Sequence, residues 1–161
     1  MSAISDDRVS AALWERRPDE AARVLGHYWN VSAPVEHGDA RGRTMGFPTA
    51  NMHLDDGCPL AFGVYAVRVI LPDGDRYDGV ANFGIRPMYR IVKPLLEAHL
   101  FDFDGDLYGQ LLTVEIVAWL RGEESFSGLD ALIKQIQNDA ALAREILARK
   151  VMENAVVDLT R

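Results

Sequence analysis

Between residues 63 and 120, runs of β-forming residues alternate with turns too short to contain a helix. The turn signals "PDGD" (72–75) and "DGD" (104–106) stand between such runs. Strands joined without helical crossovers indicate an antiparallel sheet or a closed barrel. The first run, "GVYAVRVIL" (63–71), is rich in β-branched and aromatic residues, and it is followed by "RYDGVANFG" (76–84), "PLLEAHLFDF" (94–103) and "LLTVEIVAWL" (111–120).

Helical patterns flank this β region on both sides. Residues 6–25 predict two short helices, with Pro18 in the first turn of the second and Gly26 as its stop. From Ser125 onward the apolar spacing changes to that of an amphipathic helix of about five or six turns. Its apolar positions are Leu129, Leu132, Ile133, Ile136, Ala140, Ala143 and Leu147. We therefore divide the chain into a helical segment (1–26), a main domain (27–150) and a tail without pattern (151–161).

Charge and composition exclude several classes of protein. The formal net charge of −7 disfavours a nucleic-acid binder, which normally presents a basic surface. A single cysteine, Cys58, excludes an internal disulfide and a cysteine-rich metal site. No apolar stretch approaches the roughly 20 residues that span a bilayer, and the first ten residues lack a signal-peptide pattern. We expect a cytoplasmic protein without nucleic-acid or membrane partners.

The segment "HGDARGRTMGFPTANMHL" (37–54) has the composition of a phosphate-binding loop. Gly38, Gly42 and Gly46 allow close approach of the backbone to a ligand, and Arg43 offers charge-assisted hydrogen bonds to phosphate. The G-K-[ST] ending of a Walker loop is missing. A purely structural glycine-rich turn explains the same composition.

Thr49 and Asn51 stand one residue apart at the end of that loop. On an extended backbone their side chains point the same way. Two neutral oxygens suit Mg²⁺, which prefers oxygen ligands and fills the rest of its shell with waters and phosphates.

In "LLEAHLF" (95–101), Leu96, Ala98 and Leu100 alternate with a face that carries Glu97 and His99. A carboxylate held among large apolar side chains can take a proton from a substrate hydroxyl. A solvent-facing strand edge fits the pattern equally well. Arg121, at the end of the last strand, is suited to clamping a phosphate or a planar ring, although most strand-terminal arginines do neither.

Taken together, residues 25–147 resemble the riboflavin kinase family, specifically the kinase module of bacterial bifunctional riboflavin kinase/FAD synthetases. The glycine-rich loop that ends in Pro-Thr-Ala-Asn, followed by E-x-H-x-x-x-F and D-L-Y-G, is a highly specific combination. The landmarks are "HGDARGRTMGFPTAN" (37–51), "PLAFGVYAV" (59–67), "GVANFGIRP" (79–87), "LLEAHLFDFDGDLYG" (95–109) and "LRGEESFSGLDALIKQIQND" (120–139).

The resemblance implies a mainly β fold: a six-stranded antiparallel Greek-key barrel with a long C-terminal helix. It implies transfer of the γ-phosphoryl of ATP to the ribityl 5′-hydroxyl of riboflavin, giving FMN and ADP, with Mg²⁺ or another divalent cation. Glu97 would be the catalytic base, and Arg121 and Phe126 would bind the flavin. Thr49 and Asn51 would hold the metal and the nucleotide, together with Gly38, Gly42, Arg43 and Gly46.

Two departures from the family pattern and two alternatives stay open. Met88 replaces a common threonine, and Lys93-Pro94 stands before the Glu97 strand, where it could shift the start of that strand.

The alternatives are a non-catalytic flavin or nucleotide-binding module and a split-barrel FMN oxidoreductase. Residues 4–26 resemble the helical segment that ends the adenylyltransferase half of bifunctional members, so a longer parent protein with that domain is one origin of the chain. The paired-histidine motif of that domain is missing, and we do not expect FAD formation.

Overall fold

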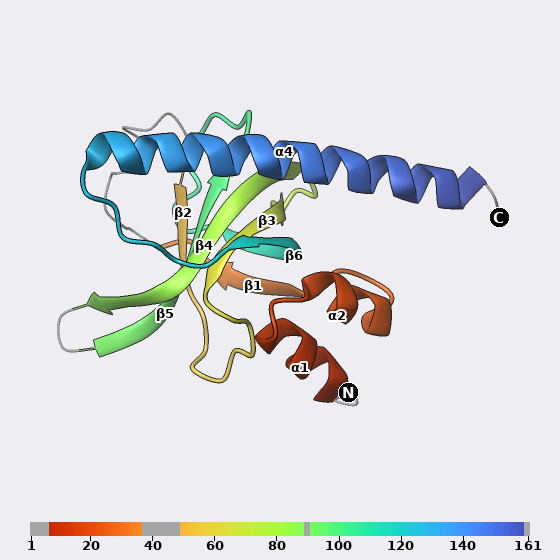
Figure 1. Cartoon of the computed structure of the whole chain (residues 1–161), viewed down its shortest axis with the longest axis horizontal. Helices are drawn as coiled ribbons and strands as arrows, with labels where there is room; N and C mark the ends of the chain where they lie inside the picture. Colours follow the sequence, from red (N-terminus) through yellow and green to blue (C-terminus); the bar gives the residue numbers. More distant parts are fainter. Residues whose placement is uncertain (1–6, 37–48, 89–90, 160–161) are drawn as a thin grey trace.

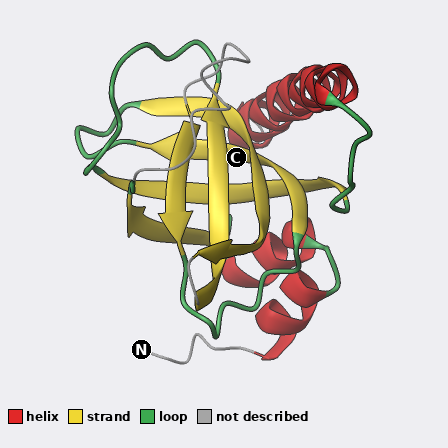
Figure 2. Cartoon of the chain, turned by 90° about the vertical axis from the view of Figure 1, so that its left-hand side faces the viewer, coloured by secondary structure: helices red, strands yellow, loops and turns green. Residues whose placement is uncertain are grey.

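A computed structural model describes residues 7–36, 49–88 and 91–159. Six strands form one antiparallel sheet in the order β1-β6-β3-β4-β5-β2. Figure 2 shows the sheet curled into a barrel, with α4 against one side and the pair α1–α2 at another. The strands are β1 (Asn30–Pro34), β2 (Thr49–His53), β3 (Gly63–Ile70), β4 (Arg76–Met88), β5 (Ile91–Leu100) and β6 (Leu111–Arg121).

The barrel is nearly closed, as the sequence predicted. At the open edge, Glu36, two residues after the end of β1, forms an isolated β-bridge with Asn51 of β2. Consecutive strands β3, β4 and β5 pair as hairpin neighbours, and β6 returns to pair with β3. The four strands predicted between residues 63 and 120 are therefore confirmed, and the sheet adds β1 and β2.

The β4–β5 hairpin is longer than its hydrophobic pattern indicates. Its pairing continues to Met88 opposite Ile91, and it projects beyond the barrel in Figure 1. Ile85 is already exposed, so alternation of apolar residues gives no signal for this extension. Pro94 lies inside β5, and its carbonyl accepts the Leu54 N–H at 3.2 Å.

Two layers of apolar side chains pack on opposite faces of the sheet. Tyr65, Phe83 and Leu96 belong to the larger cluster inside the barrel. On the outer face a smaller cluster joins strand residues such as Val64 and Val80 to α4. Because β3 is covered on both faces, its sequence is a nearly continuous apolar run.

The N-terminal helices are α1 (Asp7–Trp14) and α2 (Pro18–Leu25). Pro18 occupies the first turn of α2, and Gly26 ends it in the left-handed conformation at φ 84°. The Gly26 N–H donates to the Ala22 carbonyl at 2.8 Å. Both predicted end signals are confirmed.

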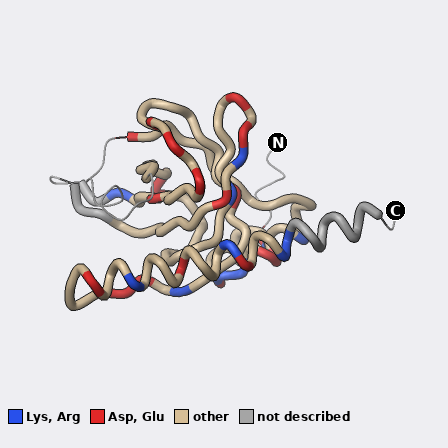
Figure 3. The backbone as a smooth tube through the Cα atoms, turned by 90° about the horizontal axis from the view of Figure 1, so that it is seen from above, with Lys and Arg blue, Asp and Glu red and all other residues tan. Residues whose placement is uncertain are grey.

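Helix α4 (Leu129–Leu159) has 31 residues and runs through most of the segment that we assigned to a tail. In Figure 1 it crosses the barrel and continues past it. The prediction was too short because amphipathic spacing records only the turns that pack against a partner. Acidic and basic residues are interspersed along the described part of α4 (Figure 3). No described helix is long and apolar enough to cross a membrane.

Candidate active site

A row of polar side chains crosses the outer face of the barrel. Asn51 of β2 is paired with Glu97 of β5, which is paired with Asn82 of β4. The row continues through Val64 of β3 to Arg121 of β6. Residues directly opposite one another on neighbouring strands share a face of the sheet. Strand register therefore gathers polar side chains from segments up to 70 positions apart, from Asn51 to Arg121.

A second pair lies beside this row. Thr49 is opposite His99, and Thr49 Oγ1 is 3.1 Å from His99 Nδ1. Burial lowers the pKa of His99, and this effect outweighs the opposing influence of the Glu97 charge. A neutral imidazole has one donor and one acceptor nitrogen, so Nδ1 can accept a hydrogen bond from the Thr49 hydroxyl.

A cavity of about 910 Å³ lies between this face and the start of α4. That volume is within the usual range for small-molecule sites. Its polar end is lined by Asn82, Glu97 and His99. The opposite side comes from the segment before α4 and from α4 itself. It combines the carboxylates of Glu123 and Glu124 with an apolar strip, which is formed by Phe126, Leu129, Leu132 and Ile136. The apolar strip suits the planar part of an elongated ligand whose other part is polar.

Arg121 lines the cavity, but its guanidinium is held by a neighbour. Its Nε donates to Asp139 Oδ1 at 3.0 Å, and its Nη2 donates to Asp139 Oδ2 at 2.8 Å. The Nη1 group donates to the Gly122 carbonyl at 2.9 Å. The Arg121 Cζ atom lies 5.7 Å from the centre of the Phe126 ring. Arg121 is therefore in place for a planar ligand, with part of its hydrogen bonding already used.

Asn82 carries an orphaned polar atom. Its Oδ1 is buried and has no hydrogen-bond partner among the described residues. A buried acceptor without a partner is costly, and such atoms often mark the place of a ligand donor. Asn82 is not among the site residues predicted from the sequence. The available signal was an asparagine inside a strand, where this residue is uncommon.

The residues present fit a divalent cation that arrives with phosphates. Thr49 and Asn51 lie two positions apart on β2 and offer neutral oxygens, and Glu97 stands opposite Asn51. No group of three or more His, Cys, Asp or Glu side chains within the described ranges is arranged to hold a metal. Mg²⁺ commonly binds through a few protein oxygens, with waters and phosphates as the remaining ligands.

The predicted nucleotide-binding loop is not described by the structure. Gly38, Gly42, Arg43 and Gly46 lie outside the described residues, so their assignment to the nucleotide stays a prediction.

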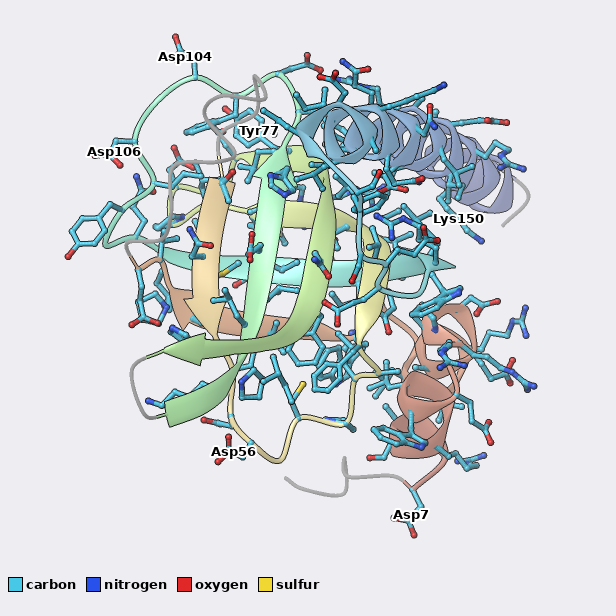
Figure 4. The ribbon with its side chains drawn as sticks, turned by 60° about the vertical axis from the view of Figure 1, so that its left-hand side comes forward. Asp7, Asp56, Tyr77, Asp104, Asp106 and Lys150 are labelled. Carbon is cyan, nitrogen blue, oxygen red and sulfur yellow. The ribbon has the colours of Figure 1, made fainter. Side chains whose placement is uncertain are left out.

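The residues of the turn signal at 104–106 do not line the cavity. Asp104 and Asp106 point away from the barrel (Figure 4). Asp106 Oδ1 accepts the Tyr108 N–H at 2.9 Å, as expected for a turn.

Residues 25–147 match the flavokinase family, described as riboflavin kinase. This chain belongs to the riboflavin kinase family. The matched range contains every residue that lines the cavity.

Individual relatives agree with this membership. A bifunctional riboflavin kinase/FMN adenylyltransferase of Haemophilus influenzae is 40% identical over 141 residues, covering 88% of this chain and 46% of the relative. The protein of that name in Escherichia coli K12 is 42% identical over 142 residues, covering 88% and 45%. The chain thus spans slightly less than half the length of these curated relatives.

Two solved structures share the fold. A Streptococcus pneumoniae crystal structure, described as a macrolide-efflux protein, matches with a TM-score of 0.78 and 33% identity over 88% of this chain and 46% of that one. A riboflavin kinase from Trypanosoma brucei matches with a TM-score of 0.52 and 24% identity over 74% of this chain and 79% of that one, which supports the fold alone.

The structure brings together some of the residues that the sequence predicted for the site. Thr49, Asn51 and Glu97 lie on the paired strands β2 and β5. Glu97, Arg121 and Phe126 line the cavity, whereas Thr49 and Asn51 are not among its lining residues. The structure adds Asn82, His99 and Asp139 to the site. The partnership of Asp139 with Arg121 has no local sequence signal, because the two residues are 18 positions apart on different elements.

Proposed function

We propose that this chain transfers the γ-phosphoryl group of ATP to the ribityl 5′-hydroxyl of riboflavin, giving FMN and ADP. The observation that carries the proposal is the pairing of Glu97 with Asn51 on one side and Asn82 on the other, at one end of a cavity whose opposite side carries an apolar strip. A base, neutral oxygens for a cation and a slot for a planar ring are thereby adjacent.

Phosphoryl transfer depends mainly on positioning and on neutralising charge. Glu97 accepts the proton of the ribityl 5′-hydroxyl while the hydroxyl oxygen forms a bond to the γ-phosphorus. ADP leaves with the electrons of the broken P–O bond. Thr49 and Asn51 would hold the divalent cation and the phosphates, and His99 orients Thr49 through their hydrogen bond. The cation, when bound, neutralises phosphate charge.

The flavin lies along the apolar side of the cavity in this proposal. The ring rests against Phe126 and the first turns of α4, and the ribityl chain extends toward Glu97. On this path a ribityl hydroxyl can donate to the orphaned Asn82 Oδ1, which removes its burial cost.

A longer parent protein with an adenylyltransferase domain is part of the proposal, since the curated relatives are about twice as long. So is a cytoplasmic location, where ATP is supplied.

The test is to incubate the protein with riboflavin, ATP and Mg²⁺ and to separate the flavins by chromatography. We expect ATP-dependent FMN. Glu97→Gln should lower kcat by about 10²–10⁴-fold, the usual contribution of a general base, with flavin affinity retained. Glu145→Gln is the matched control, because Glu145 is an exposed residue of α4 outside the cavity.

Three outcomes would count against the proposal. Near-normal turnover by Glu97→Gln would remove Glu97 from the mechanism. Flavin binding without FMN formation would favour a non-catalytic module. Bleaching of bound flavin by NAD(P)H would favour an FMN oxidoreductase.

A further inference from the structure

Two stretches of helix α4 differ in their contacts. In the middle stretch (140–147), Ala140, Ala143 and Leu147 are buried with strand residues of the outer cluster. In the first stretch (129–136), Leu132 and Ile136 are only half-buried and line the cavity, and Leu129 is 62% exposed. The middle stretch is therefore anchored by apolar packing, whereas the first stretch forms a wall whose apolar side chains still face open space.

Asp139 stands between the cavity-lining stretch and the buried stretch of α4. Only 5% of this residue is exposed, which is unusual for a carboxylate. Its oxygens accept from Arg121 Nε and Nη2, and Gln135 Nε2 donates to Oδ1 at 3.0 Å. A bidentate, charge-assisted pair of this kind fixes the orientation of the guanidinium as well as its distance from the carboxylate.

Three groups surround the Arg121 guanidinium. Asp139 holds one edge of the guanidinium, the Gly122 carbonyl holds another, and the Phe126 ring lies near its face. The last residue of β6, the segment before α4 and α4 itself are thus joined at one point. Each of these elements contributes residues to the cavity.

We propose that Asp139, acting through Arg121, is a positioning residue that sets the width of the slot for the planar ring of the substrate. The identity of that ring as a flavin rests on the proposed function. Asp139 is not catalytic: Arg121 is three strands from Glu97 in the row Arg121–Val64–Asn82–Glu97, a separation of about 14 Å at ordinary strand spacing. The proposal therefore requires that variants of Asp139 change the substrate affinity and leave kcat unchanged.

The test compares Asp139→Asn with Asp130→Asn, a matched change at an exposed aspartate of the same helix. Flavin Kd is measured by fluorescence quenching, Mg·ADP Kd by calorimetry, and KM and kcat by FMN formation. We expect Asp139→Asn to raise flavin Kd and riboflavin KM at least tenfold, with kcat and Mg·ADP Kd changed by less than threefold. Asp130→Asn should match the wild type, and Asp139→Glu should recover part of the lost flavin affinity.

Gln135→Met removes only the supporting hydrogen bond, so it keeps the inference testable if Asp139→Asn does not fold. It should raise flavin Kd two- to fivefold. A lower Tm with unchanged flavin Kd in both variants would show a merely structural pair and overturn the inference. So would an equal loss of flavin and Mg·ADP affinity, or a fall in kcat at constant flavin Kd. The proposed function fails separately, if the wild type binds flavin without forming FMN.

Discussion

Replacing Leu147 by alanine tests how α4 is held on the barrel. The Leu147 side chain is 0% exposed and belongs to the cluster that joins the middle stretch of α4 (140–147) to the outer face of the sheet. Alanine keeps the helix propensity, so the measured loss reports packing rather than helix formation.

The magnitude follows from what surrounds the side chain. Leucine-to-alanine changes in cores cost about 2–5 kcal/mol, and the cost is larger where neighbours cannot move into the space. On the helix, Ala140 and Ala143 are too short to fill it, and Val64 and Val80 are fixed by strand pairing. We therefore expect a loss of about 3–5 kcal/mol in the free energy of unfolding.

Urea unfolding followed by tryptophan fluorescence measures this loss. With a slope of about 2 kcal/mol per M, the midpoint should fall by about 2 M without a change in slope. Leu142→Ala is the control, because Leu142 lies on the same helix and is 41% exposed, and it should cost less than about 1 kcal/mol. Equal midpoints for the two variants would refute the assignment of the middle stretch of α4 as the anchor.

Two further predictions concern β4 and the loop after β5. A Cβ at position 79 would lie 2.5 Å from the His99 carbonyl oxygen, so Gly79→Ala should force β4 and β5 apart and cost about 1–3 kcal/mol by thermal unfolding. Gly57→Ala, with nothing within 4 Å, should leave Tm unchanged. The Arg144 hydrogen bond, and then its charge, lower the pKa of Asp102. Arg144→Gln should return that pKa toward its ordinary value in an NMR titration, and an unshifted Asp102 would contradict this cause. Because the folded-state pKa is lowered, the stabilisation exists above the ordinary carboxyl pKa and is lost as pH falls through the folded value.

Local patterns predicted the elements of the fold well. Turn residues separated the strands, Pro18 and Gly26 bounded α2, and the alternation around Glu97 identified the face that carries it. Each of these signals depends on neighbours within a few positions, where propensity and periodicity act. The hairpin extension and the end of α4 were missed because both run past the barrel in Figure 1, where apolar periodicity gives little signal.

The assembly of the site was less predictable from local patterns. Asn51 and Glu97 meet only through the β2–β5 register, and register depends on the packing of the whole barrel. Without the family resemblance, a structural glycine-rich turn explained the loop, and a solvent-facing strand edge explained the Glu97 strand. Asp139 gave no signal at all, since its importance comes from a partner on another element.

The placement of the site on the outside of the barrel wall has an evolutionary consequence. Along β4 and β5, Asn82 and Glu97 alternate with inward neighbours such as Ala81, Phe83 and Leu96. One set of positions specifies chemistry and the interleaved set specifies folding. Drift at the outward positions can therefore alter what the barrel recognises while its interior stays intact, so a single frame can be adapted to new small molecules without first being redesigned.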